Sequence, residues 1–260
     1  MGGRLSKRGE FPHMAAIGWR TTTGSLAFKC GGSIISERYI LTAGHCTRAA
    51  EDTNLADLQP KIVRLGRNNI GETVMSNHKA KDVNISEIIP HPMYAPPKKY
   101  YDIALLRVEE EIIFNSDIYP ACLWTDMSLQ SSGFNGTVTG WGVEKLGDQR
   151  TSVELKAAEV NLVDSLMCDF LLEPYCNRHW CGVGGHQLCA GTLAGGTDTC
   201  QGDSGGPIQV KMNVSSDIKH DVYLILGVTS FGFKCGLPNV PGIYTRVASF
   251  RDWIENIVWK

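Results

Sequence analysis

The segment Gly202-Asp203-Ser204-Gly205-Gly206-Pro207 has the residue types of a nucleophile turn. A serine hydroxyl is a weak nucleophile and needs a positioned base. Glycines on both sides of Ser204 allow a tight turn and a close approach of the backbone to a substrate. Such a turn can direct the amide N–H groups of Gly202 and Ser204 at one point, where they would stabilise an oxyanion. The alternative is an ordinary glycine-rich turn between two strands.

Two further residues could complete a catalytic group. His45 comes just after a short apolar run, and Asp102 opens another one, Ile103–Leu106. Taken alone, His45 is better interpreted as a half-buried structural histidine, and Asp102 as a residue that begins a strand. Together, in the chain order His, Asp, Ser, they predict a base and an orienting carboxylate for Ser204.

The rest of the chain must supply rigid elements that hold these residues. Short apolar or alternating runs recur between turn signals and predict β-strands. These runs are Ser33–Ile35, Tyr39–Ala43, Lys61–Leu65, Val83–Ile89, Ile103–Val108, Thr137–Trp141, Leu155–Val163, Ile208–Lys211, Tyr223–Thr229 and Gly242–Val247. Many short strands without intervening helices favour an all-β sandwich or a pair of barrels. The segment Asn115–Thr125 lies near mid-chain and could connect two β units.

The C-terminus has a different pattern. Its apolar side chains recur at the spacing of one helix face, at Phe250, Trp253, Ile254, Ile257 and Val258. Ser249 stands in front of them as the predicted N-cap. The sequence therefore predicts one amphipathic closing helix.

Composition limits the possible functions. The chain has 260 residues, with 25 Lys and Arg against 27 Asp and Glu, and a net charge of −2. This balance argues against a dedicated nucleic-acid or anionic-membrane binder, which would normally carry a basic stripe. A hydrophobic content of 43% and a charged content of 20% exclude a disordered chain. The apolar runs are far too short to span a bilayer, which takes about 20 residues.

Nine cysteines indicate a compartment that permits disulfides. Glycosylation sequons at Asn84, Asn135 and Asn213 agree with this interpretation. The first ten residues contain no apolar signal segment. We therefore expect a secreted, extracellular protein, of which this chain is the mature part or a piece.

These motifs resemble the chymotrypsin/trypsin-like serine protease family over nearly the whole chain, and most closely the catalytic domains of arthropod clip-domain proteases. The resemblance is carried by Cys30-Gly31-Gly32-Ser33, Thr42-Ala43-Gly44-His45-Cys46, Asp102-Ile103-Ala104-Leu105-Leu106, Gly140-Trp141-Gly142, Gly202 through Pro207, and Pro241-Gly242-Ile243-Tyr244.

The resemblance implies an all-β fold of two packed six-stranded antiparallel β-barrels with a C-terminal α-helix. The whole chain, 1–260, would be one peptidase domain. Its N-terminal barrel would cover about 12–120, its C-terminal barrel about 130–245 and its closing helix about 249–259.

The resemblance also implies the roles of the site residues. His45 would take the proton from Ser204, Asp102 would orient and stabilise the imidazolium, and the N–H groups of Gly202 and Ser204 would form the oxyanion hole. Asp198, six residues before Ser204, falls at the floor of the primary pocket. A carboxylate there would pair with a substrate Arg or Lys, because a desolvated guanidinium without a counter-charge is costly.

Four further residues belong to the expected substrate site. Gly232 and Gly242 match small pocket-wall positions, and Ser230 begins a segment whose backbone would pair with the substrate. Lys99, three residues before Asp102, falls at the second subsite. We expect it to disfavour a basic residue before the cleaved Arg or Lys, the alternative being a solvated lysine.

The resemblance assigns Asp203 to an ion pair with the α-amine of the mature chain, which shapes the oxyanion hole. Mature members begin with Ile or Val, one further residue and Gly-Gly, whereas this chain begins Met1-Gly2-Gly3. A molecule that started at Met1 would be one residue short for this ion pair.

Three disulfides follow from the resemblance: Cys30–Cys46, Cys168–Cys189 and Cys200–Cys235. Cys176 and Cys181 lie in an insertion between Cys168 and Cys189, where they could form a further disulfide, and the sequence alone leaves the connectivity of these four cysteines open. They could alternatively bind zinc together with His179 and His186, but we favour the disulfide and predict no metal and no cofactor.

Cys122 remains without an expected partner in this chain. In many relatives the matching cysteine is tied to a propeptide or light chain. The resemblance therefore implies an upstream propeptide or clip domain, linked by a disulfide through Cys122. The alternative is a free thiol.

The sequence thus predicts a secreted trypsin-like endopeptidase, activated from a zymogen in an extracellular cascade of clotting, melanisation or innate immunity. Its expected partners are a protein substrate, itself a zymogen, and a serpin-type inhibitor, with no nucleic acid and no membrane. One alternative is a non-catalytic homologue that acts as a binding module, which the presence of His45, Asp102 and Ser204 disfavours. Another is a venom or salivary protease that acts on host haemostasis.

Overall fold

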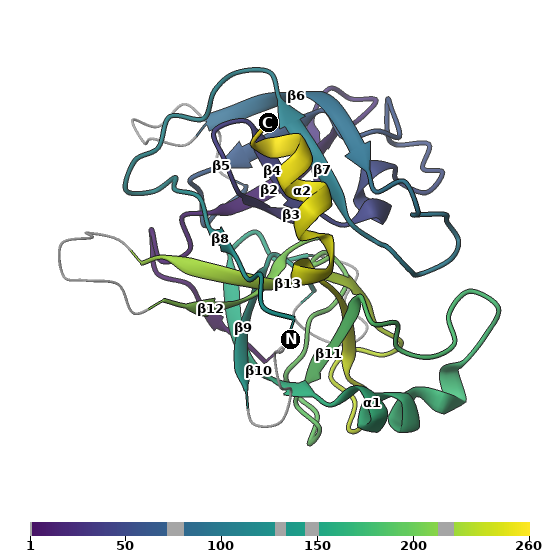
Figure 1. The fold of residues 1–260 in the computed structure, drawn as a ribbon. Coiled ribbons are helices and arrows are strands. Elements are labelled where there is room, and N and C mark those ends of the chain that lie inside the picture. Colours follow the sequence, from purple (N-terminus) through teal and green to yellow (C-terminus); the bar gives the residue numbers. More distant parts are fainter. Residues whose placement is uncertain (1, 72–80, 128–133, 144–150, 213–220) are drawn as a thin grey trace.

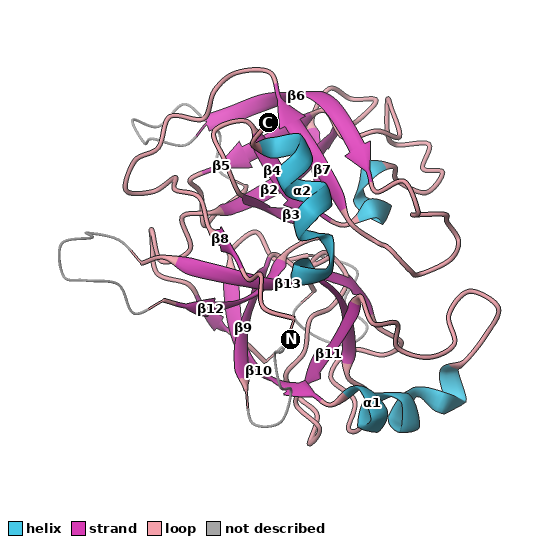
Figure 2. Cartoon of the chain, viewed as in Figure 1, coloured by secondary structure: helices cyan, strands magenta, loops and turns pink. Residues whose placement is uncertain are grey.

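Strands dominate the architecture (Figure 2). The computed structural model describes residues 2–71, 81–127, 134–143, 151–212 and 221–260 (Figure 1). Met1 and the sequon at Asn213 lie outside these ranges. The predicted all-β fold of two six-stranded antiparallel barrels with a C-terminal helix is confirmed.

The first barrel closes in the strand order β2-β3-β4-β7-β6-β5. Its strands are β2 (Met14–Arg20), β3 (Leu26–Ile34), β4 (Tyr39–Thr42), β5 (Ile62–Leu65), β6 (Lys81–Pro90) and β7 (Ala104–Val108). In the antiparallel pair of β4 with β7, Thr42 lies opposite Ala104. The segment that follows β4 and the segment that precedes β7 therefore meet at one end of the barrel.

The second barrel closes because β9 pairs with both β10 and β12. Its strands are β9 (Asn135–Gly140), β10 (Lys156–Val163), β11 (Gln187–Gly191), β12 (Pro207–Lys211), β13 (Tyr223–Phe231) and β14 (Gly242–Arg246). Two short strands join the first half of the chain to this barrel: β1 (Arg4–Leu5) pairs with β10, and β8 (Cys122–Leu123) pairs with β13.

The predicted closing helix is present as α2 (Arg251–Val258), preceded by the 3-10 turn η3 (Val247–Phe250). The N-cap prediction is wrong, because Ser249 lies inside η3 and Phe250 occupies the cap position without a side-chain hydrogen bond. The helix lies against the first barrel (Figure 1), where it buries Ile254. No helix within the described ranges is long and apolar enough to cross a membrane.

A second helix, α1 (Ser165–Leu172), has no counterpart among the predicted elements. Its N-cap, Asp164, accepts hydrogen bonds from the N–H groups of Leu166 and Met167. Leu166 and Phe170 are exposed, at 81% and 73%. Apolar side chains therefore lie on the exposed side of the helix as well as on its buried side, at Cys168 and Leu172, which removes the periodic signal by which helices are predicted.

The largest buried apolar cluster is shared by the two barrels. It contains Leu105 of β7, Ile225 and Val228 of β13, and Phe250 and Ile254 of the closing segment. Apolar burial across this junction fixes the barrels against each other. Loops from both barrels can therefore meet with constant geometry.

Four disulfides are present: Cys30–Cys46, Cys168–Cys189, Cys176–Cys181 and Cys200–Cys235. Three of these are the pairs that the family resemblance implies. The remaining disulfide, Cys176–Cys181, leaves no thiol at either position for the alternative zinc site. Among the nine cysteines, all within the described ranges, Cys122 is free and exposed.

Candidate active site

The barrel register brings His45 and Asp102 together. His45 lies on the 3-10 turn η1 (Gly44–Thr47), directly after β4, and Asp102 lies just before β7. The His45 Nδ1 and Asp102 Oδ2 atoms are 2.8 Å apart, and the backbone N–H of His45 donates to Asp102 Oδ1, also at 2.8 Å. The carboxylate therefore fixes both the position and the orientation of the imidazole.

The second barrel completes the surroundings of Asp102. The Ser230 hydroxyl donates to Asp102 Oδ2 at 2.5 Å, and the Thr245 hydroxyl donates to the Asp102 carbonyl oxygen at 2.7 Å. Ser230 turns inward at a bulge, because the register of β13 against β14 shifts between Thr229 and Phe231. Bulges commonly re-aim a side chain in this way.

Asp102 is held as a carboxylate. It is only 2% exposed, and this burial acts to raise its pKa. The adjacent His45 and the hydrogen bonds from His45 and Ser230 outweigh burial, so the pKa lies below its usual value. The group therefore carries a negative charge next to His45 at neutral pH.

Ser204 and Gly202 lie on the turn between Cys200 and β12. Together with His45 they line an open cavity of about 600 Å³. Gly202 has a φ of +97°, which glycine adopts without strain. Within the described ranges, the N–H groups of Gly202 and Ser204 have no hydrogen-bond acceptor. The Gly31 N–H donates to the Ser204 carbonyl at 2.8 Å and so joins this turn to β3.

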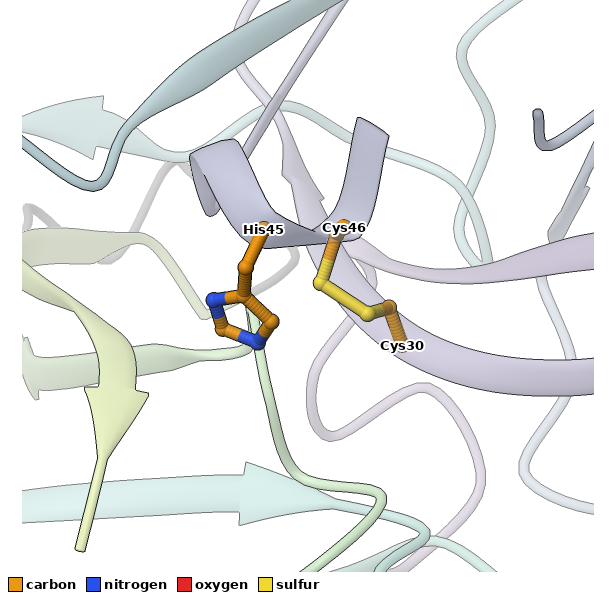
Figure 3. A group of neighbouring side chains, drawn as sticks. All are labelled: Cys30, His45 and Cys46. Carbon is orange, nitrogen blue, oxygen red and sulfur yellow. A yellow bond between two sulfur atoms is a disulfide. The ribbon is translucent and has the colours of Figure 1, made fainter. Parts of the chain in front are cut away.

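The Cys30–Cys46 disulfide lies beside the His45 ring (Figure 3). It ties η1 to β3 and thereby fixes the turn that carries the imidazole. The ligand atoms of Cys30, His45 and Cys46 lie within 4.8 Å of one another. Both sulfur atoms are in the disulfide, so this group offers no thiolate to a metal ion.

Asp198 lies buried, at 5% exposure, beside Gly242. A Cβ atom placed on Gly242 would be 3.3 Å from Asp198 Oδ1, whereas one placed on Gly232 would meet no atom within 4 Å. The Gly236 N–H donates to Asp198 Oδ2 at 3.0 Å. Burial raises the pKa of Asp198 to about 6.

Asp203 is also buried, and backbone amides hold both of its oxygens. The Gly142 N–H donates to Oδ1 at 2.7 Å, and the Cys200 N–H donates to Oδ2 at 2.9 Å. Burial raises the pKa of Asp203 above its usual value. A cavity of about 90 Å³ next to it is also lined by Gly2 and Gly3.

The structure thus brings His45, Asp102 and Ser230 into hydrogen-bond contact, and it places Gly202 and Ser204 on the cavity that His45 also lines. The Lys99 ammonium lies 5.7 Å from the centre of the Phe231 ring, and its effect on specificity stays a prediction. Sequence reasoning missed Thr245 and the hydroxyl contact of Ser230. Neither residue belongs to a sequence motif from which a contact with Asp102 could be predicted.

Comparisons with known proteins identify similar chains. The family model named Trypsin matches residues 1–254. Serine protease snk of Drosophila melanogaster is 38% identical over 265 residues, covering 100% of this chain and 57% of that protein. Serine protease Hayan of the same fly is 41% identical over 260 residues, covering 99% of this chain and 38% of that protein.

A relative from a mosquito is also a serine protease. CLIP domain-containing serine protease B4 of Anopheles gambiae is 35% identical over 275 residues, covering 100% of this chain and 70% of that protein. The expected similarity to arthropod clip-domain proteases is confirmed. The chain spans about half the length of the first two relatives.

The contact between Gly142 and Asp203 predicts a specific loss of stability. A Cβ atom on Gly142 would be 2.4 Å from Asp203 Oδ2. We expect Gly142→Ala to lower the free energy of unfolding by roughly 1–3 kcal/mol, as overpacking does. Gly232→Ala is the matched control and should change it by less than about 0.5 kcal/mol. Urea unfolding of both variants measures the difference, and equal stabilities would contradict the tight contact.

Proposed function

The chain belongs to the trypsin family of serine proteases, and from this premise we propose that it is a secreted endopeptidase that cleaves after Arg or Lys. The observation that carries the proposal is the buried carboxyl of Asp198 beside Gly242. A buried carboxyl is costly, and a guanidinium or ammonium of the substrate would compensate its charge. The open space at Gly232 leaves room for a long side chain.

We propose that Ser204, His45 and Asp102 carry out acyl transfer. The Ser204 Oγ atom attacks the carbonyl carbon of the cleaved bond, and its proton passes to His45 Nε2. The same proton then goes to the leaving amine, and water hydrolyses the acyl-enzyme by the reverse sequence of proton transfers. The hydrogen bond between His45 Nδ1 and Asp102 Oδ2 supports this assignment, since it leaves Nε2 to act as the base.

The oxyanion of the tetrahedral intermediate would bind to the N–H groups of Gly202 and Ser204. Within the described part of the chain these groups have no other acceptor, and both residues line the cavity that His45 shares. Preorganised backbone donors of this kind stabilise the developing charge without reorganisation at the moment of reaction.

Asp203 is proposed to control activation from a zymogen. Its carboxyl is buried, burial raises its pKa, and the adjacent cavity contains the backbone of Gly2 and Gly3. An α-amine in this cavity would supply a positive charge that compensates the buried carboxylate. This ion pair would hold the Gly202–Ser204 turn in the form that binds the oxyanion.

The biological setting is proposed from the relatives. The chain is homologous to arthropod cascade proteases, so its substrate would be another extracellular zymogen and its inhibitor a serpin. A non-catalytic homologue that acts as a binding module would give no burst in the titration described next. A venom or salivary protease would share the same chemistry and differ in the identity of its substrate.

Active-site titration tests the nucleophile and the specificity together. A nitrophenyl guanidinobenzoate ester presents a guanidinium to Asp198 and acylates a reactive serine. We expect a burst of nitrophenol equal to the protein concentration and no burst with Ser204→Ala, because only the hydroxyl can take the acyl group.

The absence of a burst would have two interpretations: a zymogen-like molecule without its activating amine, or a non-catalytic homologue. A second preparation distinguishes between them. This preparation carries an Ile before Met1, which gives the start that mature members of the family have. A burst in that preparation alone would support the role of Asp203. No burst in either would favour the non-catalytic homologue.

The raised pKa of Asp198 predicts how cation binding depends on pH. Before a ligand binds, the Asp198 carboxyl has a pKa of about 6, and only its ionised form attracts an amidinium. The affinity for benzamidine should therefore be constant near pH 8 and fall about tenfold per unit well below pH 6. Asp198→Asn should bind weakly throughout, without this pH dependence. A wild-type affinity unchanged from pH 8 to pH 5 would exclude Asp198 as the binding group.

The exposed thiol of Cys122 supports a covalent partner. Cys122 lies on β8 beside an apolar cavity of about 580 Å³, also lined by Leu123, Met212 and Trp259. Relatives extend beyond the matched region, and one is named for its CLIP domain. We propose that an upstream segment is attached here through a disulfide.

Electrophoresis of the activated full-length protein tests this linkage. After cleavage at the activation site, the two chains should migrate together without reductant and separately with it. Cys122→Ser should separate them without reductant, because the bridging sulfur is gone. Chains of the wild type that separate without reductant would contradict the linkage.

A further inference from the structure

The backbone just before Asp102 has an unusual conformation that another residue must maintain. Tyr101 has a φ of +57°, in the left-handed region that bulky residues rarely adopt. Among the non-glycine residues that the structure describes, only Asn239 shares this property. Asparagine tolerates a positive φ, whereas a tyrosine keeps this conformation only when contacts with surrounding residues hold it in place.

The conformation of Tyr101 sets the direction of Asp102. The Ile103 N–H donates to the Tyr101 carbonyl at 2.8 Å and closes a three-residue turn with Asp102 at its centre. A rotation of the Tyr101 backbone would therefore swing the Asp102 side chain. The two 2.8 Å contacts of its carboxylate with His45 leave little room for such a rotation.

We propose that His186 is a positioning residue, whose Nε2 atom holds the Tyr101 backbone so that Asp102 points at His45. The Tyr101 N–H donates to His186 Nε2 at 3.1 Å. The His186 ring also stacks on the Tyr101 ring, with centroids 4.1 Å apart and planes 11° apart. This proposal rests on the proposed function, in which Asp102 orients the catalytic base.

The imidazole of His186 must be neutral to accept this hydrogen bond, with its proton on Nδ1. Burial, together with the nearby His91, lowers the pKa of His186 below its usual value and so favours the neutral form. Among the described residues, the rings of Tyr100 and the neutral Phe250 also lie near the His186 ring, with centroids 5.9 Å and 6.0 Å away.

The position of His186 is itself fixed by the second barrel. It directly precedes β11, and its carbonyl accepts the N–H of Arg246 at the end of β14. In the same strand pair, Gln187 lies opposite Thr245, whose hydroxyl holds the Asp102 carbonyl. The β11–β14 pair therefore grips the chain on both sides of the Asp102 side chain, through His186 before it and Thr245 after it.

Two substitutions separate the hydrogen bond from the stacked ring. His186→Phe keeps a ring against Tyr101 and removes the acceptor, whereas His186→Gln keeps an acceptor oxygen and removes the ring. On a small arginine amide substrate we expect His186→Phe to lower kcat about tenfold, since small misplacements of catalytic groups have effects of this order or more. KM should stay within about twofold, because the pocket around Asp198 is untouched. His186→Gln should recover most of the lost kcat.

The Nδ1 proton of His45 gives a direct readout. A short hydrogen bond to a carboxylate moves its resonance downfield, so the resonance should move upfield in His186→Phe and return in His186→Gln. His91→Phe is the matched control. His91 also stacks on the Tyr101 ring, with centroids 5.7 Å apart, but it makes no hydrogen bond to the Tyr101 backbone, so kcat and the resonance should not change.

The outcomes distinguish this proposal from the proposed function. If titration of the wild type gives no burst, the proposed function fails first. If the wild type gives a burst and His186→Phe keeps both kcat and the resonance, the positioning role is wrong and the proposed function stands. If His186→Phe does not fold, His186→Asn replaces it, because its shorter amide cannot reach the Tyr101 N–H. Equal kcat for the Asn and Gln variants would then overturn the proposal.

Discussion

A carboxylate buried where two barrels meet is the constraint on which the site depends. An ion removed from water is costly unless charges and hydrogen bonds compensate it. Asp102, 2% exposed, receives two hydrogen bonds from His45 of the first barrel and one from Ser230 of the second. Each barrel alone would leave this charge only partly satisfied. The apolar cluster shared across the junction is therefore a condition for the chemistry as well as for stability.

Features that follow from neighbouring residues could be predicted. The glycines around Ser204, the apolar strand after Asp102 and the spacing of the closing helix are all local patterns. Strand β2 escaped prediction because six of its seven residues, Met14–Trp19, are buried, which removes the alternation of a half-exposed strand. The first residue of α2 was not predicted correctly, because the helix follows the 3-10 turn η3, which contains Ser249, and has no side-chain cap.

Contacts between distant segments could not be predicted. Ser230 reaches Asp102 because of a one-residue shift in register, and Thr245 and His186 reach the same loop through the pairing of β11 with β14. None of these depends on the residues adjacent in sequence. Three of the four disulfide pairs follow from the family resemblance rather than from their spacing, because spacing alone does not determine connectivity.

Strand β14 combines two duties within four residues. Gly242 lies against the carboxyl of Asp198, and Thr245 holds the carbonyl of Asp102. A strand paired on both sides moves as one body, so a change that displaces Gly242 also disturbs the buried carboxylate of Asp102. Proteins that descend from this one and act on new substrates should therefore differ in the loops around the site, whereas the sequence of β14 should change little. Evolutionary change in specificity is then confined to those loops.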